Sequence, residues 1–327
     1  MRVSPFTSLA LLCGVALMSA TGPCAAQNTP AQNWPQHTVR MITPLAPGTG
    51  MDAAARLFAE RLSQKWGQPV VVENRQGADG ILAVQSFMTD RDNHSLIFGF
   101  AGLISINPLI HGDKLPYDIR DVVPVASAID STLALAASDT LKVDSLQAFV
   151  KLARERPGQM NWAASAGLPL YVVAALQKAA GIDVTQIAYR DFLPAFQDFA
   201  SGRLQLIAGG ITPLLPQVHS GRGKFLMVTN SERSPLAPDV PTPKEAGFPE
   251  LTFNGTNGIF GWRDMPESLK ARIAADVRVI ATDPAVAERL KPTGATMRPG
   301  NAAEFAAAIE DQRVKVAAAA QTGAPPK

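Results

Sequence analysis

The feature that most constrains this fold is a short apolar stretch that passes through a small-residue turn into an amphipathic segment. The stretch begins at Val39, and the turn reads Pro47-Gly48-Thr49-Gly50-Met51-Asp52. Apolar residues then recur at helical spacing and predict a helix with one buried face: Ala54, Leu57, Phe58 and Leu62. Gly67 stands where a C-terminal cap belongs, and Pro69 prevents the helix from continuing into the apolar run Val70–Val72. The segment therefore predicts a strand–loop–helix–strand unit.

Such a turn leaves backbone N–H groups unpaired at the start of a helix, where the helix dipole also favours negative charge. It is therefore a ready site for an anion such as a carboxylate. A P-loop is excluded, because no Gly-Lys-Ser/Thr sequence follows. Residues 48–53 do fit Gly-x-Gly-x-x-Ala, with Glu73 about 20 residues beyond, so a dinucleotide site stays open as an alternative. In a third interpretation, the glycines merely make a tight turn.

The N-terminus predicts a secretory signal peptide over residues 1–26. Arg2 precedes an apolar run from Leu9 to Met18, and small residues lead up to a cleavage site after Ala26. Pro23 before Cys24 argues against a lipoprotein signal. Cleavage would remove both cysteines of the chain, so disulfides would not stabilise the mature protein. Export also disfavours the dinucleotide interpretation, because nicotinamide cofactors are mainly cytoplasmic.

Charge and histidine content exclude several classes of function. The formal net charge is only +2 and no basic block appears, which argues against a nucleic-acid partner. The four histidines, at positions 37, 94, 111 and 219, lie far apart without a metal-ligand spacing. We expect neither a metal site nor a cofactor, and we expect a monomer.

Strand and helix patterns alternate along the chain, which predicts an α/β fold with largely parallel sheets. The region from Pro266 onward is expected to be mostly helical, with Asn301 and Glu304 capping the last long helix, and residues 321–327 are expected to fray. Ligands of such folds sit beyond the carboxyl ends of strands. The candidate ligand-binding residues occupy five strand ends: Pro47, Gly48, Thr49, Gly50, Met51 and Asp52; Phe100, Ala101 and Gly102; Ser165, Ala166 and Gly167; Tyr189, Arg190 and Asp191; and Gly209 and Gly210. Strong acids and bases are few among them, which favours binding over catalysis.

Several blocks resemble the Bug family, the periplasmic solute receptors of tripartite tricarboxylate transporters. Residues 47–52 are similar to the family's Pro-x-Gly-Gly-Gly-x-Asp but one residue shorter. Gly67–Ala78 resembles Gly-Gln-Pro-Val-Val-Val-Glu-Asn-x-x-Gly-Ala, and Leu115–Asp118 and Asn161–Ala163 also match in order. Residues 231–247 contain Arg-Ser-Pro, Asp-Val-Pro-Thr and Glu-Ala-Gly. The resemblance covers nearly all of the mature chain.

The resemblance implies a two-lobed, flytrap-like (type II-like) periplasmic binding protein with a ligand cleft between the lobes. Lobe one would comprise residues 34–128 and 253–320, and lobe two residues 129–251. The family holds a ligand carboxylate through main-chain donors and bridging waters. The resemblance therefore implies a small organic carboxylate as ligand and membrane transporter subunits as partners.

Three departures from the family pattern bear on the ligand. Where the family reads Ser-Gly-x-Gly-Ser/Thr-x-x-His, this chain has Ser165 to Tyr171 with apolar residues and Tyr171 in place of the hydroxyl and the imidazole. Tyr-Lys-Gly is replaced by Tyr189-Arg190-Asp191, and an Asp-Asn pair by Gly209-Gly210. These changes suggest a pocket that is more apolar at one end. Arg190 would either clamp a carboxylate or pair with Asp191 or Asp198, and Tyr189 would form an aromatic wall.

Within the first loop, Thr49 and the N–H groups of Gly50 and Met51 are the expected carboxylate donors. Asp52 either serves the helix N-terminus by its charge or contacts a polar ligand group such as an amine. The function we expect is capture of a small carboxylate by hinge closure, without catalysis. One alternative is an adaptor that reports its closed state to a membrane sensor. Another is a secreted hydrolase or isomerase, against which the missing Gly-x-Ser-x-Gly elbow and the absence of a histidine near a nucleophile both argue.

Overall fold

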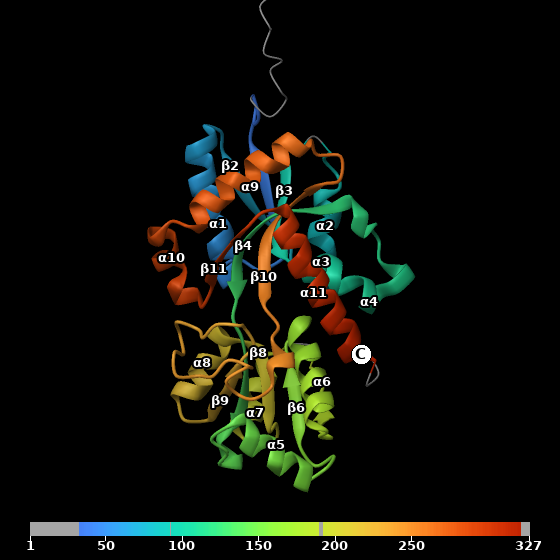
Figure 1. Ribbon diagram of the computed structural model, residues 1–327, viewed down its shortest axis with the longest axis vertical. Coiled ribbons are helices and arrows are strands. Elements are labelled where there is room, and N and C mark those ends of the chain that lie inside the picture. The colour runs from blue at the N-terminus through green and yellow to red at the C-terminus, as the bar shows by residue number, and fades with distance from the viewer. Residues whose placement is uncertain (1–32, 92, 190–191, 322–327) are drawn as a thin grey trace, which may run out of the picture.

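The apolar segments of the sequence assemble into two separate β-sheets. The structure is a computed structural model that describes residues 33–91, 93–189 and 192–321. The predicted signal peptide, the Arg190-Asp191 pair and the tail beyond residue 321 lie outside the described residues. Figure 1 shows the sheets as two lobes, one above the other, with two strands running between them.

The first sheet has six strands in the order β11-β4-β10-β3-β1-β2. β1 pairs in parallel with β2 and β3, whereas β10 runs antiparallel to β3 and β4, and β11 antiparallel to β4. Its strands are β1 (Val39–Thr43), β2 (Val70–Asn74), β3 (Ser95–Phe100), β4 (Val122–Ser131), β10 (Gly255–Trp262) and β11 (Thr296–Gly300).

The second sheet has five strands in the order β7-β6-β8-β5-β9. β6 is parallel to β7 and β8, and β5 is antiparallel to β8 and β9. Its strands are β5 (Leu133–Ser138), β6 (Asn161–Ala164), β7 (Thr185–Gln186), β8 (Leu206–Gly210) and β9 (Gly223–Val228).

The expectation of largely parallel sheets is wrong, because both sheets are mixed. β4 leaves the first sheet at Ser131 and continues through Thr132 into β5, while β10 brings the chain back antiparallel to β4. β11 was not predicted in a region expected to be mostly helical. It is a short edge strand that pairs only with β4 and contains a proline, so it carries little strand signal of its own.

Helices cover both faces of each sheet and supply the core. In the first lobe one core cluster includes α1, α9 and α10, and another includes α2, α3 and α11. In the second lobe α5 and α6 pack on one face and α7 and α8 on the other. The helices are α1 (Gly50–Trp66), α2 (Ile81–Phe87), α3 (Gly102–Ser105), α4 (Asn107–His111), α5 (Leu146–Glu155), α6 (Leu168–Ala180), α7 (Leu193–Ala200), α8 (Ile211–His219), α9 (Glu267–Ala281), α10 (Pro284–Leu290) and α11 (Ala302–Ala320).

Two local predictions are confirmed by the backbone. α1 ends at Gly67, which adopts the left-handed conformation at φ 69° and donates its N–H to Ser63 O. α11 begins with a capping box in which Asn301 accepts from the Glu304 N–H and Glu304 accepts from the Asn301 N–H.

The last helix joins the two lobes as a third connection beside β4 and β10. Near its start, Phe305 and Ile309 pack in the core of the first lobe. Near its end, Val316 and Ala319 belong to the core cluster of the second lobe, where α11 packs against α6. Figure 1 shows α11 descending from the upper lobe to the side of α6. The lobes are thus held by two strands and one helix, which limits the paths along which they can move relative to each other.

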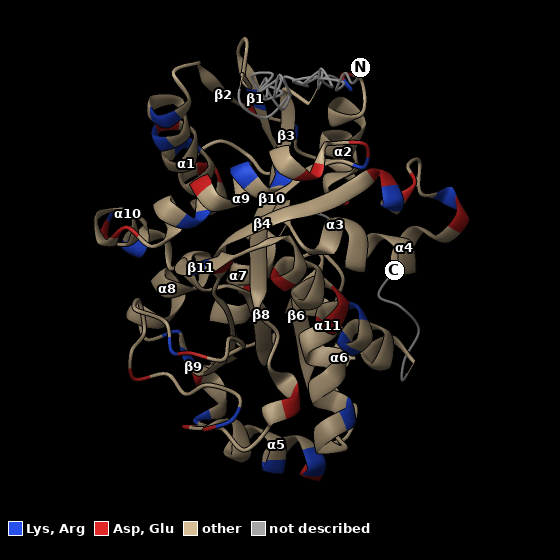
Figure 2. Cartoon of the chain, turned by 45° about the horizontal axis from the view of Figure 1, so that its top comes forward, with Lys and Arg blue, Asp and Glu red and all other residues tan. Residues whose placement is uncertain are grey.

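Charged residues are scattered over the outside of both lobes. Figure 2 shows Lys and Arg interspersed with Asp and Glu on the outer helices, without a large surface of one sign. Within the described residues, no helix combines the length and the apolar character needed to cross a membrane.

Candidate ligand-binding site

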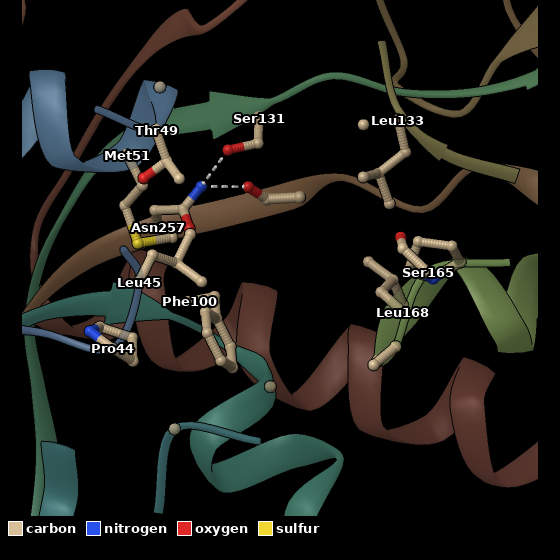
Figure 3. A pocket seen from close by; sticks show the side chains of 18 of the residues that line it. Pro44, Leu45, Thr49, Met51, Phe100, Ser131, Leu133, Ser165, Leu168 and Asn257 are labelled. Atoms are coloured by element: carbon tan, nitrogen blue, oxygen red, sulfur yellow. Dashed lines mark hydrogen bonds between the residues drawn. The ribbon is translucent and has the colours of Figure 1, made fainter. Parts of the chain in front are cut away.

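A cavity of about 600 Å³ lies between the two lobes. It is lined by the start of α1, the end of β3, the strands that cross between lobes, and the starts of α6 and α8. Figure 3 shows Leu168 and Ser165 of the second lobe facing Met51, Leu45 and Phe100 of the first lobe across this space. The volume falls within the range of clefts that hold small molecules.

The start of α1 presents backbone donors to the cavity. Thr49 is the N-cap: its Oγ1 accepts from the Asp52 N–H at 3.3 Å and donates to Ala46 O at 2.9 Å. The N–H groups of Gly50 and Met51 have no hydrogen-bond partner within the described part of the chain, and both residues line the cavity. These two N–H groups, at the positive end of a helix of 17 residues, can hold an anion.

Asp52 holds this loop in place from behind. Its carboxylate accepts from the Gly48 N–H at 2.9 Å, from Asn74 Nδ2 at 2.8 Å and from Arg56 Nε at 3.1 Å. The residue is only 3% exposed and does not line the cavity. Burial alone would raise the pKa of Asp52, but the hydrogen bonds from Arg56, Asn74 and Gly48 together lower its pKa below the usual value. Asp52 therefore stays charged and ties the loop to α1 and β2.

The second lobe also directs helix starts at the cavity. The N–H groups of Ala166, Gly167, Leu168 and Thr212 line it and have no hydrogen-bond partner within the described part of the chain. Neither α6 nor α8 has a side-chain N-cap hydrogen bond. Pro169 and Pro213, which both line the cavity, remove one N–H each from the first turns. The Ile211 N–H is already paired with Thr132 O at 3.0 Å. Leu168 at the start of α6 adds an apolar side chain, so this wall combines apolar side chains with backbone donors.

Where the crossing strands meet, Asn257 of β10 and Ser131 of β4 form the back of the cavity. Asn257 Nδ2 donates to Ser131 Oγ at 2.9 Å and to Gly255 O at 2.5 Å, as the dashed lines in Figure 3 show. Because Ser131 Oγ accepts this bond, its own proton is left to donate elsewhere. This hydroxyl is one neutral donor that a ligand in the cavity can reach.

Among the described residues that line the cavity, Asp79 is the only one with a charged side chain. It lies in a single 3-10 turn (η1, Ala78–Gly80) with φ 54°, and its Oδ2 is 3.1 Å from His111 Nε2. Nearby Tyr171 has a raised pKa because of burial and, secondarily, the charge of Asp79. No lysine, arginine or histidine of the described chain lines the cavity, so an anion there depends on backbone, hydroxyl and amide donors.

The structure brings together part of the residue set predicted from the sequence. Those that line the cavity are Thr49, Gly50, Met51, Phe100, Gly102, Ser165, Ala166, Gly167 and Gly210. Those that do not line it are Pro47, Gly48, Asp52, Ala101, Tyr171, Tyr189 and Gly209. The predicted site residues Arg190 and Asp191 lie outside the described residues.

Three of these departures have a clear local reason. The Tyr171 side chain is 1% exposed and belongs to the core between α5 and α6, because it lies on the face of α6 that packs into the second lobe. Tyr189 donates its hydroxyl to Asp198 Oδ2 at 2.7 Å, and burial, followed by this bond, raises its pKa to about 12. Ala101 is buried and uses its N–H to bond Thr256 O at 3.0 Å.

The sequence analysis missed the cavity residues that come from the crossing strands and from the loop before β11. Asn257 and Ser131 are 126 residues apart in sequence, and Thr293 contacts the start of α1 from the far end of the chain. No local pattern marks these positions, since they come together only through antiparallel pairing and lobe packing. Among the described residues, no cluster of three or more His, Cys, Asp or Glu side chains is placed to hold a metal ion.

Two mixed α/β lobes with a cleft between them define a class of ligand-binding proteins, and comparison with known proteins specifies the family. Residues 54–322 match the family model described as "Tripartite tricarboxylate transporter family receptor". The chain belongs to this family of solute receptors, which are not enzymes, and the resemblance seen in the sequence is confirmed.

Individual relatives are similar over most of their length. A UPF0065 protein of Bordetella bronchiseptica is 30% identical over 95% of this chain and 92% of its own length. The structure of Rpa4515 of Rhodopseudomonas palustris with adipate is 25% identical, with a TM-score of 0.75 over 88% of this chain and 98% of that one. MatC of the same organism, with bound malate, is 27% identical, with a TM-score of 0.69 over 86% and 100%. These matches confirm the two-lobed binding-protein fold.

Proposed function

We propose that this chain captures a small organic carboxylate in the cavity between its lobes and delivers it to a membrane transporter. The observation that carries the proposal is the pair of unpartnered N–H groups at Gly50 and Met51, which open into the cavity at the positive end of α1. The relatives crystallised with adipate and malate support a carboxylate as the ligand class.

The carboxylate would lie against the start of α1. One oxygen can accept from the two N–H groups, and the Ser131 hydroxyl is a further donor from the crossing strand. Hydrogen bonds to a charged group contribute about 1.5–3 kcal/mol each, so two or three of them suffice to select an ionised acid over its neutral amide. Thr49 would act indirectly, since its hydroxyl proton is already donated to Ala46 O.

Closure of the lobes would complete the site. The division we propose places residues 34–128 and 253–320 in lobe one and residues 129–251 in lobe two, with bending at the crossing strands. Two contacts already join the lobes beside the cavity: Thr212 Oγ1 donates to Thr293 O at 2.9 Å, and Thr132 Oγ1 donates to Gly294 O at 2.7 Å. A ligand that touches both walls favours the closed state, because only that state offers it both sets of contacts.

The site of action would be the periplasm. Residues 1–26 have the charge, apolar run and small-residue end of a cleavable signal peptide. The family description supplies the partner class, the membrane subunits of a tripartite transporter.

Thermal unfolding of the purified protein with a panel of carboxylic acids, each paired with its amide, tests the proposal. At a hundred times its dissociation constant, a ligand that binds only the folded state adds about 2.7 kcal/mol to the free energy of unfolding and raises the Tm by several degrees. We expect a shift with an acid and none with its amide. Equal shifts with acid and amide, or no shift with any acid, would contradict a carboxylate receptor.

A further inference from the structure

We infer that the ligand of this receptor is a 2-hydroxy acid, and that the side-chain carbonyl of Asn257 recognises its hydroxyl group. The inference rests on the proposed function and names the chemical class of the ligand of the same cavity. It follows from the hydrogen bonds of Asn257 and Ser131, which leave one acceptor and one donor close together at the crossing strands.

The orientation of the Asn257 amide is fixed by its neighbours. Nδ2 lies 2.5 Å from Gly255 O, and because a carbonyl oxygen only accepts, the amide atom that faces it is the nitrogen. The second Nδ2 proton goes to Ser131 Oγ at 2.9 Å. Both amide protons are thus used within the protein. Oδ1 is the polar atom of this side chain that accepts no hydrogen bond from the residues that the structure describes.

This unpartnered oxygen belongs to a residue that is almost completely enclosed. Asn257 is only 1% exposed and lines the cavity, and Figure 3 shows it on the first-lobe side, across from Ser165 and Leu168. A buried acceptor that finds no donor weakens a complex, so a ligand that covers Oδ1 has to bring a donor of its own. A carboxylate cannot serve, because its two oxygens only accept.

Ser131 supplies the complementary half of the recognition. Its Oγ accepts from Asn257 Nδ2, so its own proton is left to donate. Since Oδ1 and Nδ2 belong to one amide group, Oδ1 lies within a few ångströms of this hydroxyl. A donor and an acceptor at such close spacing match a carboxylate oxygen and a hydroxyl on the neighbouring carbon atom. The carboxylate oxygen accepts from Ser131, and the ligand hydroxyl donates to Asn257 Oδ1.

A hydroxyl fits this place better than an ammonium group does. Both can donate, but the Asn257 carbonyl is neutral and gives a cation no counter-charge. The positive end of the α1 dipole, at Gly50 and Met51, faces the same cavity and disfavours a cation beside the bound carboxylate. The site therefore favours a 2-hydroxy acid over the corresponding 2-amino acid.

Calorimetric titration of the purified protein with matched acids at neutral pH tests the inference. The pairs are hexanoate with 2-hydroxyhexanoate and adipate with 2-hydroxyadipate, and 2-aminohexanoate carries an ammonium group in place of the hydroxyl. We expect the hydroxy acid to bind ~10-fold or more tightly than its parent acid, because a site that hydrogen-bonds a hydroxyl rejects the analogue that lacks it.

The other outcomes separate the inference from the proposed function. Hydroxy acids that bind no more tightly than their parent acids would overturn the inference and leave the carboxylate receptor standing. Tighter binding of 2-aminohexanoate than of 2-hydroxyhexanoate would overturn the assignment of a hydroxyl. Failure of every acid to bind the folded protein would overturn both the inference and the receptor.

A substitution at Asn257 sharpens the test. Asn257→Leu replaces the amide by hydrocarbon of similar shape, and we expect the affinity for 2-hydroxyhexanoate to fall ~10-fold while that for hexanoate changes little. Asn254→Leu is the matched control, since Asn254 does not line the cavity and its Oδ1 already accepts from the Ser231 N–H at 3.1 Å. We expect this control to keep the preference for the hydroxy acid. A folded Asn257→Leu protein that keeps the preference, or that loses affinity for both acids equally, would contradict a hydroxyl contact at Asn257. The comparison of acids on the unmodified protein does not depend on this variant.

Discussion

The two walls of the cleft are built from the same element, a strand that ends in a glycine-containing turn and continues into a helix, yet the loops of the two walls are held in different ways. At the first wall, α1 has a threonine cap and two free N–H groups. At the second wall, α6 and α8 have no side-chain cap bond and carry prolines in their first turns. Both walls present free N–H groups to the cavity, those of Gly50 and Met51 at the first and those of Ala166, Gly167, Leu168 and Thr212 at the second. The walls differ in the capping residue and in the anchoring of the loop, since only the first has a side-chain cap and a buried carboxylate behind it.

The largest effect should come from closing the α1 end. A Cβ added at Gly50 would stand 3.1 Å from Thr293 Cβ, so Gly50→Val must displace the loop and cover the donors of the first turn. Loss of two charge-assisted hydrogen bonds corresponds to about 3 kcal/mol, and we expect at least ~100-fold weaker binding by calorimetry. Ala53→Val, an exposed position on the same turn, is the control and should bind normally. Normal affinity in Gly50→Val would contradict a carboxylate site at this wall.

A smaller loss should follow from loosening the loop without touching its donors. Asp52→Asn places an amide where Gly48, Asn74 and Arg56 all donate, so at least one buried donor loses its acceptor. We expect about 1–3 kcal/mol lower stability in chemical denaturation and ~10-fold weaker binding. Glu60→Gln on the same helix, whose ion pair with Arg289 is exposed, should change neither. Equal behaviour of the two variants would show that Asp52 does not support the site.

The same variant has a pH signature. Because the pKa of Asp52 is lowered in the folded protein, its contribution to stability is fully present above its unfolded pKa and is lost as pH falls through the lowered folded value. The gap in stability between the unmodified protein and Asp52→Asn should therefore be constant near neutral pH and shrink in the acid range below about pH 4. Denaturation at a series of pH values measures this gap. A gap that stays constant down to the acid limit would contradict the hydrogen-bonded carboxylate.

Substitutions at the second wall should reduce ligand affinity less than those at the first wall, and the reduction should depend on the ligand. Leu168→Ala removes apolar contact worth about 1 kcal/mol, so we expect ~5-fold weaker binding of an apolar monocarboxylate. Unchanged affinity would show that the Leu168 side chain does not contact the ligand. Thermal unfolding without ligand separates this effect from any change in packing.

The smallest change in ligand affinity is expected when one N–H donor is restored at the second wall. Pro169→Ala restores an N–H near the start of α6, and a helix-terminal N–H interacts with an anion by about 0.3–1 kcal/mol. We expect adipate to bind about 2–5-fold more tightly and hexanoate to be unaffected. Pro284→Ala at the exposed start of α10 is the control for the general cost of losing a proline there. An equal gain for both acids would show that the restored N–H does not face the distal end of the ligand.

Local chemistry explains which parts of the site the sequence could predict. The α1 end was predictable because its cap, donors and helix lie within one contiguous stretch that starts at Thr49 and ends at Gly67. Tyr171 was placed at the site because it follows the loop in which the family has a hydroxyl and an imidazole, but in the structure it lies on the face of α6 that packs into the core. Asn257 and Ser131 could not be predicted, because each becomes a cavity residue only when β10 pairs with β4.

The same reasoning applies to the fold. Alternating strands and helices predicted an α/β protein, and family-like blocks predicted two lobes, which the comparisons confirm. The antiparallel pairing of β4, β5 and β10 was not predicted. The direction of pairing depends on how the chain crosses between the lobes and not on the strands' own residues. The strand β11 was not predicted for a further reason, because a short edge strand with a proline has no periodic pattern.

The central claim is that the ligand carboxylate binds at the start of α1. A crystal structure of the protein with hexanoate bound tests it most directly. We expect a carboxylate oxygen within hydrogen-bond distance of the Gly50 and Met51 N–H groups, with the hydrocarbon chain directed at Leu168. A carboxylate bound at the starts of α6 and α8, with the hydrocarbon chain directed at α1, would contradict the carboxylate site at α1.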